Sequence, residues 1–151
     1  MTKASFSDLK NKTVIIAGAT GLIGRELCKG FVEQESIVIL ASKNRVKGKK
    51  LENKLRELNR GSSVYYQLDI SKEKSVDDLI EAVLEKNSKI DVFVNCSWPK
   101  TKDWMTNVEK VHYQSVKENL VNHLGGYFLC TQKMAITMKK QRAGSIINFG
   151  S

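Results

Sequence analysis

Residues 13–24 read TVIIAGATGLIG, a run that favours a β-strand, then a glycine-rich turn and the start of a helix. The three glycines have different expected roles: Gly18 permits a tight turn, Gly21 lets the backbone approach a ligand, and Gly24 lets the helix pack on the strand. Because free N–H groups of the first helical turn would face the loop, the stretch predicts binding of a dinucleotide through its pyrophosphate. A glycine-rich turn without a ligand is the alternative, which the flanking strand and helix disfavour. The expected contacts are Gly18, Thr20, Gly21, Leu22, Ile23 and Gly24.

Length and composition predict one globular domain over residues 1–151, since 41% of the residues are hydrophobic and only one is proline. Residues 1–12 contain no apolar run of signal-peptide length, and nothing approaches the roughly 18 apolar residues of a membrane helix. We therefore expect a cytoplasmic protein without a membrane partner. Cys28, Cys96 and Cys130 form no Cys-x-x-Cys pair, so we expect three buried thiols, and no disulfide or metal site.

The net charge of +9 fits either a nucleic-acid partner or a solvated basic surface. Most of the basic residues lie at helical spacing beside acidic ones, as Glu52 and Arg56 do. This pattern favours the solvated surface, and we expect no nucleic-acid partner.

Short apolar runs alternate with amphipathic stretches along the whole chain. Parallel strands can be joined only by long crossovers, so this alternation predicts a doubly wound α/β fold. Ser71 is the expected N-cap of the third helix, and the irregular loop 97–107 follows the carboxyl end of a strand, where such sheets bind ligands. The expected strands are 13–17, 37–41, 64–67, 92–95 and 145–149, and the expected helices are 22–34, 46–59, 72–86 and 108–141.

The end of the second expected strand indicates which dinucleotide would bind. An acidic residue there would hold the ribose hydroxyls of NAD, whereas basic residues would hold the 2′-phosphate of NADP. Residues 41–45 read ASKNR, without a carboxylate, so Ser42, Lys43 and Arg45 favour NADP(H), with NAD as the alternative cofactor. The competing interpretation is that Lys43 and Arg45 merely begin a basic solvated helix.

Four motifs together resemble the N-terminal part of the short-chain dehydrogenase/reductase family. They are GATGLIG at 18–24, LDI at 68–70, DVFVNCS at 91–97 and GSIINFGS at 144–151, and the resemblance extends over residues 10–151. It implies a five-stranded parallel sheet in the order 3-2-1-4-5, in a chain truncated after the fifth strand. The activity it implies is NAD(P)-dependent hydride transfer to or from a carbonyl or secondary alcohol.

The resemblance also implies roles for individual residues. Asp69 and Ile70 would line the adenine, and Asn95, Cys96 and Ser97 would line the cofactor groove. Ser151 matches the serine that orients the substrate carbonyl or hydroxyl. His123 occupies the position of an asparagine whose backbone serves a proton relay, and Asn122 directly precedes it, so either could take this role. A histidine beside an apolar helical face can equally be structural.

Two departures from the family pattern affect the expected function. Residues 95–99 read NCSWP, and a Trp-Pro here resembles members that act in bacterial surface-polysaccharide and flagellin-sugar biosynthesis. This similarity suggests a small-molecule substrate that is a sugar or sugar nucleotide. The family's Tyr-x-x-x-Lys is absent from the 151 residues. Its tyrosine is the general acid/base and its lysine lowers a phenol pKa of about 10, so we expect this chain to be inactive.

The last strand would then form an open edge, through which the chain could pair with a partner or form a homo-oligomer. A non-catalytic dinucleotide-binding or interaction protein is the alternative function. A methyltransferase also uses a glycine loop after its first strand. It is disfavoured because the acidic residue after the second strand is missing.

Overall fold

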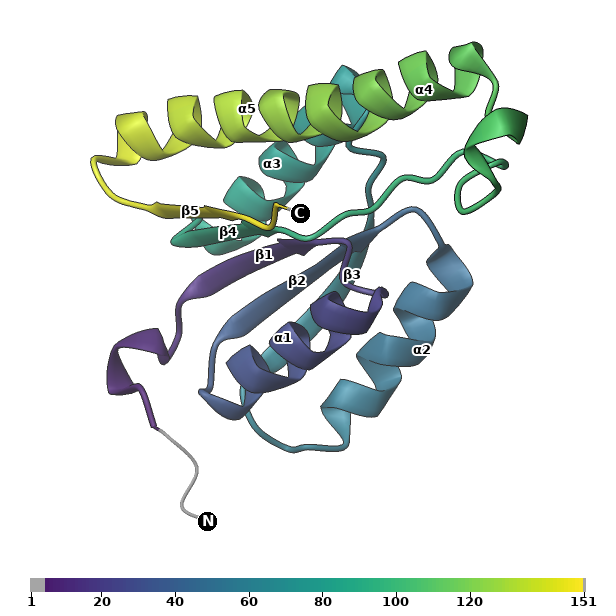
Figure 1. Cartoon of the computed structure of the whole chain (residues 1–151). Helices are drawn as coiled ribbons and strands as arrows, with labels where there is room; N and C mark the ends of the chain where they lie inside the picture. The colour runs from purple at the N-terminus through teal and green to yellow at the C-terminus, as the bar shows by residue number, and fades with distance from the viewer. Residues whose placement is uncertain (1–4, 151) are drawn as a thin grey trace.

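The computed structural model describes residues 5–150 and contains one five-stranded, all-parallel sheet in the order β3-β2-β1-β4-β5 (Figure 1). The predicted fold class and strand order are thus confirmed. The strand ends agree with the prediction to within two residues. The strands are β1 (Thr13–Ala17), β2 (Ile37–Ser42), β3 (Ser62–Gln67), β4 (Val92–Asn95) and β5 (Ser145–Asn148).

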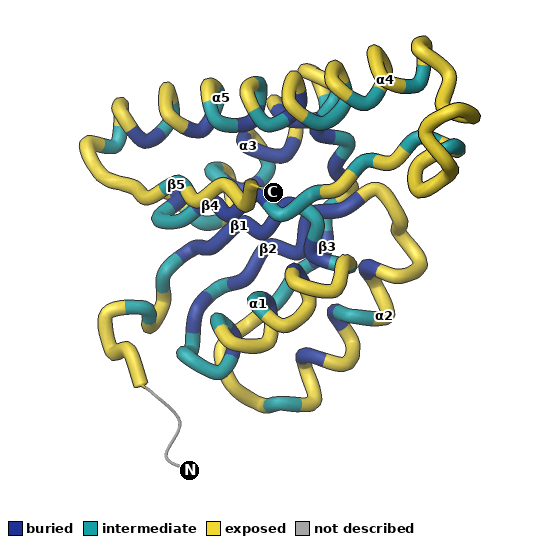
Figure 2. Tube along the Cα trace, in the orientation of Figure 1, coloured by how far each residue is buried: buried dark blue, intermediate teal, exposed yellow. Residues whose placement is uncertain are grey.

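Helices cover both faces of the sheet, which explains why the central strands are continuously apolar. Alternate residues of each strand face opposite sides. Ile15, Ile39 and Phe93 pack against α3 (Glu73–Asn87) and α5 (Gly126–Gln141), in one core cluster. Val14 and Val38 pack against α1 (Leu22–Glu33) and α2 (Arg45–Arg56), in the other. Figure 2 shows the buried residues concentrated in the sheet and on the inner sides of these helices.

The prediction of one continuous helix over residues 108–141 is wrong. This stretch divides into a 3-10 turn (Val108–Lys110), α4 (Tyr113–Leu120), a π-helical turn (Val121–Gly125) and α5. The break before α4 has a tertiary cause, because the backbone N–H of His112 donates to Asp103 Oδ2 at 3.0 Å while His112 is extended. The π-helical turn precedes Gly126, where a Cβ would lie 2.9 Å from Ile70 Cδ1, so the helix approaches Ile70 closely.

Two smaller predictions are also wrong. Ser71 does not cap α3, because Lys72 holds the N-cap position and the Ser71 hydroxyl donates to Asp69 Oδ1 at 2.7 Å. Cys28 and Cys130 are buried thiols as expected, but Cys96 is only half-buried. Cys96 follows the carboxyl end of β4, where the chain leaves the core.

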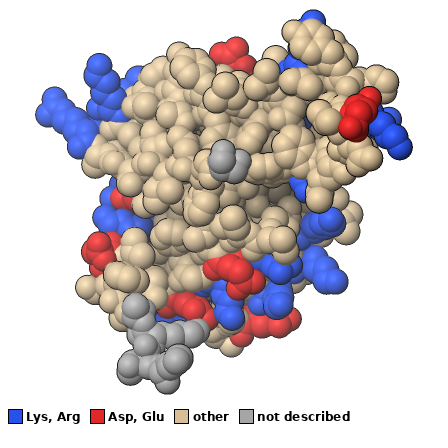
Figure 3. Space-filling model, in the orientation of Figure 1, with Lys and Arg blue, Asp and Glu red and all other residues tan. Residues whose placement is uncertain are grey.

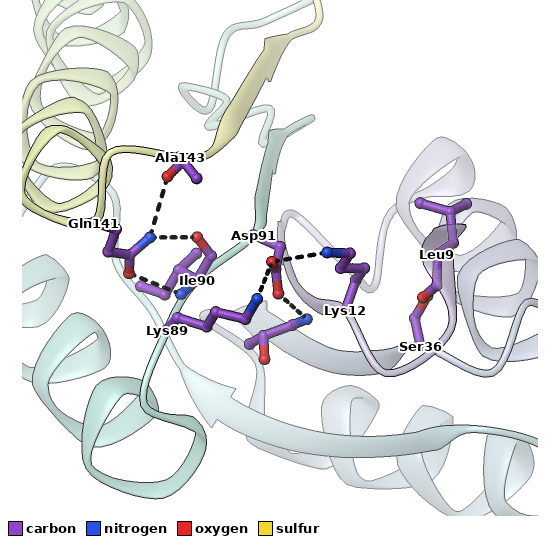
Figure 4. A network of polar contacts seen from close by, with 9 residues as sticks. Leu9, Lys12, Ser36, Lys89, Ile90, Asp91, Gln141 and Ala143 are labelled. Atoms are coloured by element: carbon purple, nitrogen blue, oxygen red, sulfur yellow. Dashed lines mark hydrogen bonds and ion pairs between the residues drawn. The ribbon is translucent and has the colours of Figure 1, made fainter. Parts of the chain in front are cut away.

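Side chains join the amino ends of the strands and fix α5 on the sheet (Figure 4). Gln141 at the end of α5 accepts from the backbone N–H of Ile90 at 3.0 Å and donates to the Ile90 carbonyl at 2.9 Å. Asp91 accepts from the backbone N–H of Thr13 at 2.9 Å and pairs with Lys89 and Lys12. These contacts set how α5, and therefore the π-helical turn before it, lies over the sheet.

Within residues 5–150, β5 pairs only with β4, and most of its residues are exposed. The ladder continues one residue past β5, since Phe149 N–H donates to the Asn95 carbonyl at 2.9 Å. In this part of the chain no helix is both long and apolar enough to cross a bilayer.

Candidate functional site

A groove of about 670 Å³ lies at the carboxyl ends of β1, β2, β3 and β4. β1 and β4 meet there at the point where the chain changes direction across the sheet, the usual ligand position in such folds. The volume suits a ligand of cofactor size. Ten of the residues predicted to bind a cofactor line it: Gly18, Thr20, Gly21, Leu22, Ile23, Ser42, Lys43, Ile70, Cys96 and Ser97.

The glycine loop has the geometry that its spacing predicts. Gly18 adopts φ +82°, and a Cβ there would lie 2.7 Å from the Cys96 carbonyl oxygen and the Ser97 nitrogen. Gly24 is buried against the Gly18 backbone, where a Cβ would collide with the Gly18 carbonyl oxygen. Gly21 is the N-cap of α1, with no side-chain cap and no acid in the first turn. The first N–H groups of α1 are therefore available to an anion at the groove.

The end of β2 supplies a buried polar group without a partner. Ser42 is 7% exposed and lines the groove, but its hydroxyl makes no hydrogen bond within residues 5–150. Tyr65 donates to the carbonyl of Ser42 at 2.8 Å and so fixes this turn. Asn44 caps α2 by accepting from Lys47 N–H at 2.9 Å, and both residues line the groove. Arg45 is not among the lining residues.

Lys43 is held by an ion pair with the next strand. Its ammonium lies 3.0 Å from Asp69 Oδ2, while Asp69 Oδ1 accepts from the backbone and hydroxyl of Ser71. Burial raises the pKa of Asp69, but the bonds from Ser71 and Lys43 outweigh it, so the net pKa lies below the usual value. Asp69 itself does not line the groove, whereas Leu68 and Ile70 on either side of it do.

Asn95 ends β4 beneath the groove rather than in its wall. It is 0% exposed, its Oδ1 accepts from Ser97 N–H at 3.2 Å, and its Nδ2 has no partner in the described chain. Burial raises the pKa of Cys96 to about 11, and its thiol donates to the Ala17 carbonyl at 3.1 Å. The Cys96 thiol is therefore uncharged near pH 7, and Cys96 contributes a neutral residue to the groove lining.

Tyr127 fixes the loop after β4. Its hydroxyl donates to the carbonyls of Asn95 and Ser97, at 3.2 and 3.1 Å. Burial, with smaller contributions from Cys96 and Cys130, raises its pKa to about 12. Tyr127 is therefore a positioning residue and not a general base near neutral pH.

The loop after β4 forms an aromatic wall that sequence reasoning did not assign to the groove. Trp98 and Trp104 meet edge to face at 5.6 Å, and Trp98 lies 4.9 Å from the ring of His123. His123 in turn contacts Tyr127 at 5.0 Å. The sequence signal that could have assigned Trp98 and Trp104 to the groove is the position of their loop directly after the carboxyl end of β4. The lining residues that were not predicted are Asn44, Lys47, Leu68, Trp98, Pro99, Lys100 and Trp104.

Two of the three predicted catalytic residues, His123 and Asn122, do not lie in the groove wall. His123 and Asn122 belong to the π-helical turn, where both are half-buried and neither lines the groove. Ser151 lies outside the described residues.

Comparison with known proteins decides the family, since residues 12–151 match the short chain dehydrogenase family. The chain belongs to the short chain dehydrogenase family. Post-translational flagellin modification protein A of Campylobacter coli is 38% identical over 144 residues, which are 95% of this chain and 56% of that protein. D-xylose 1-dehydrogenase of Caulobacter vibrioides is 30% identical over 154 residues, spanning all of this chain and 58% of that protein.

Solved structures support the same fold. NAD+-bound xylitol dehydrogenase aligns with a TM-score of 0.85 at 23% identity, over 95% of this chain and 54% of that one. The chain thus spans about half the length of the relatives it matches. Its family membership also removes the methyltransferase alternative.

Proposed function

We propose that this chain is the NADP(H)-binding part of an oxidoreductase that acts on a sugar or sugar nucleotide. The observation that carries the proposal is the groove itself. An uncapped helix N-terminus behind three glycines faces it from one side, and Ser42, whose buried hydroxyl has no partner within residues 5–150, lines it from another. When bound, the nicotinamide ring would supply or accept the hydride.

The residues present fit a dinucleotide. The first N–H groups of α1 would hold the pyrophosphate, because a side chain at Gly21 would project into that space. Leu68 and Ile70 offer apolar surface to the adenine. Asp69 lies between them but does not line the groove, so its part in the site would be to hold Lys43 there.

NADP(H) is the cofactor that the end of β2 favours. A 2′-phosphate carries about −1.5 to −2 charge near pH 7. Lys43, Lys47 and the Ser42 hydroxyl would meet it at the N-terminus of α2, and no carboxylate lines the groove within residues 5–150. NAD(H) would leave the Ser42 hydroxyl without an anionic partner, although the groove would still admit it.

Two observations favour a sugar as the substrate. Trp98 and Trp104 are 41% and 40% exposed and line the groove, and aromatic faces of this kind pack against the C–H face of a sugar ring. The names of the two relatives, flagellin modification protein A and D-xylose 1-dehydrogenase, point in the same direction. The close ring contacts of His123 support a packing role that positions Trp98, and Asn122 remains the second candidate for the proton relay.

These 151 residues by themselves would bind the dinucleotide without catalysing the reaction. Ser151 would orient the reacting carbonyl, but the sequence contains no Tyr-x-x-x-Lys to move the proton. A non-catalytic dinucleotide-binding protein is therefore the alternative for the chain as it stands, and it would use the same groove.

The test is a calorimetric titration of the chain with NADPH and with NADH. We expect tighter binding of NADPH, and we expect Lys47→Ala to weaken NADPH at least tenfold while changing NADH less than twofold. Arg45→Ala is the matched control, because Arg45 begins the same helix but does not line the groove. Equal affinity for the two cofactors, or an equal loss in both variants, would refute the assignment of NADP(H).

A further inference from the structure

Helix α2 carries lysine and arginine side chains on two of its sides, and only those on one side form ion pairs with an acidic residue. The buried carboxylate of Glu52, in a residue 1% exposed, pairs with Lys49 and with Arg56, at 2.7 Å each. One flank of the helix is therefore compensated by an acid that is itself fixed in the core.

The other flank has no such ion pairs within residues 5–150. Lys47, Lys50 and Lys54 lie at positions i, i+3 and i+7, which share one face of a helix. Across residues 5–150, none of these three ammonium groups makes an ion pair or a hydrogen bond. We call these three residues the cationic track.

The cationic track leads to the groove. Lys47 lines the groove, and at about 1.5 Å of rise per residue Lys50 and Lys54 lie roughly 5 and 10 Å farther along the helix axis. Figure 3 shows lysine and arginine side chains, with some acidic ones among them, over the part of the molecule where α2 lies, and Figure 1 shows α2 running back from the carboxyl end of β2 over one face of the sheet. The track is thus a line of unpaired charge that begins at the surface and ends where the cofactor would bind.

We propose that the cationic track attracts the phosphates of the incoming dinucleotide and speeds its association with the groove. This inference rests on the proposed function, because it requires a dinucleotide ligand. Surface charge of one sign beside a site raises association rates by about 10- to 1,000-fold, and salt removes the effect. The Debye length is about 30 Å at 0.01 M salt and 10 Å at 0.1 M, so Lys54 would act mainly at low salt.

The test measures association rates by stopped flow. Both tryptophans of the chain, Trp98 and Trp104, line the groove, so energy transfer to NADPH reports its arrival. In the variant Lys50→Glu/Lys54→Glu we expect kon for NADPH to fall about tenfold at 10 mM ionic strength and less than twofold at 0.5 M. The dissociation rate should stay within twofold, since neither residue lines the groove. NADH, which lacks the 2′-phosphate, should lose less in kon.

Lys139→Glu/Lys140→Glu is the matched control. It makes the same change in net charge in the last turn of α5, at the amino edge of the sheet and far from the groove. We expect this control to change kon less than twofold, and the milder Lys50→Gln/Lys54→Gln to give an intermediate loss. Circular dichroism verifies the fold of each variant.

Three outcomes would overturn the inference: an unchanged kon, an equal fall in the control, or a change confined to the dissociation rate. If the unmodified chain shows no NADPH binding by calorimetry, the proposed function itself fails and the track loses its ligand. Binding with a kon that does not depend on Lys50 and Lys54 would overturn the track alone.

Discussion

Replacing Gly21 by valine tests whether the glycine loop binds the pyrophosphate. Gly21 has φ −75° and ψ 175°, which any residue can adopt, and an added Cβ has one close neighbour, the Gly18 carbonyl oxygen at 3.2 Å. The remaining atoms of the valine would project into the groove that Gly21 lines. They would separate the first N–H groups of α1 from any phosphate.

The expected loss of affinity follows from those N–H groups. A hydrogen bond to a charged group contributes about 1.5–3 kcal/mol, so losing two of them weakens NADPH binding by about 3–6 kcal/mol, at least 100-fold. The free energy of unfolding should change by no more than about 1 kcal/mol, because glycine at an N-cap is replaced by a poorer capping residue.

Calorimetry measures the affinity, and thermal denaturation measures the stability. Gly30→Ala is the control, since Gly30 lies in α1 with open space around it and should gain about 0.5–1 kcal/mol of stability with unchanged binding. If Gly21→Val bound NADPH within fivefold of the unmodified chain, the loop would be only a turn.

Three further predictions concern stability and activity. Gln141→Ala should lower the free energy of unfolding by about 1–3 kcal/mol, because the buried backbone of Ile90 loses both partners, whereas exposed Gln132→Ala should be neutral in thermal denaturation. Burial raises the pKa of Asp91, but the hydrogen bonds from Thr13 and Lys89 and the charges of Lys89 and Lys12 outweigh it, so the net pKa lies below the usual value. The stabilisation by Asp91 is therefore present above a pH of about 4 and is lost as the pH falls through the folded-state pKa. Asp91→Asn should therefore destabilise the chain at pH 7, with a difference that disappears in acid; a constant difference down to pH 2 would contradict this. Finally, we expect no detectable hydride transfer from the 151 residues alone, and measurable turnover would contradict this. We also expect the chain to associate through the exposed β5, and a strictly monomeric sedimentation profile at high concentration would contradict that.

The sequence predicts the sheet well because burial on both faces leaves a local signal. Runs such as 13–17 and 37–41 are apolar throughout, and glycines at 18, 21 and 24 allow only a few arrangements of the turn between strand and helix. The break in the predicted helix 108–141 was not predictable in this way. It depends on a bond between Asp103 and His112, nine residues apart in an irregular loop.

The residues of the candidate site likewise divide into those that a local motif predicts and those that tertiary contacts bring to the groove. Residues fixed by a motif, such as Gly21 and Ser42, line the groove as predicted. Lys47, Trp98 and Trp104 reach it because of how α2 begins and how the loop after β4 folds back, and neither follows from local spacing. The partners of Asp69 and Asn95 also depend on tertiary contacts.

We expect this chain to bind a nicotinamide dinucleotide in the groove at the carboxyl ends of the strands. Backbone amide chemical shifts recorded by NMR during a titration with NADPH test it most directly. We expect the largest shifts in residues 18–24, 42–47 and 96–98, and none in residues 11, 35 and 59–62 at the opposite edge of the sheet. Shifts that are absent at millimolar NADPH, or that centre on the opposite edge, would contradict the claim.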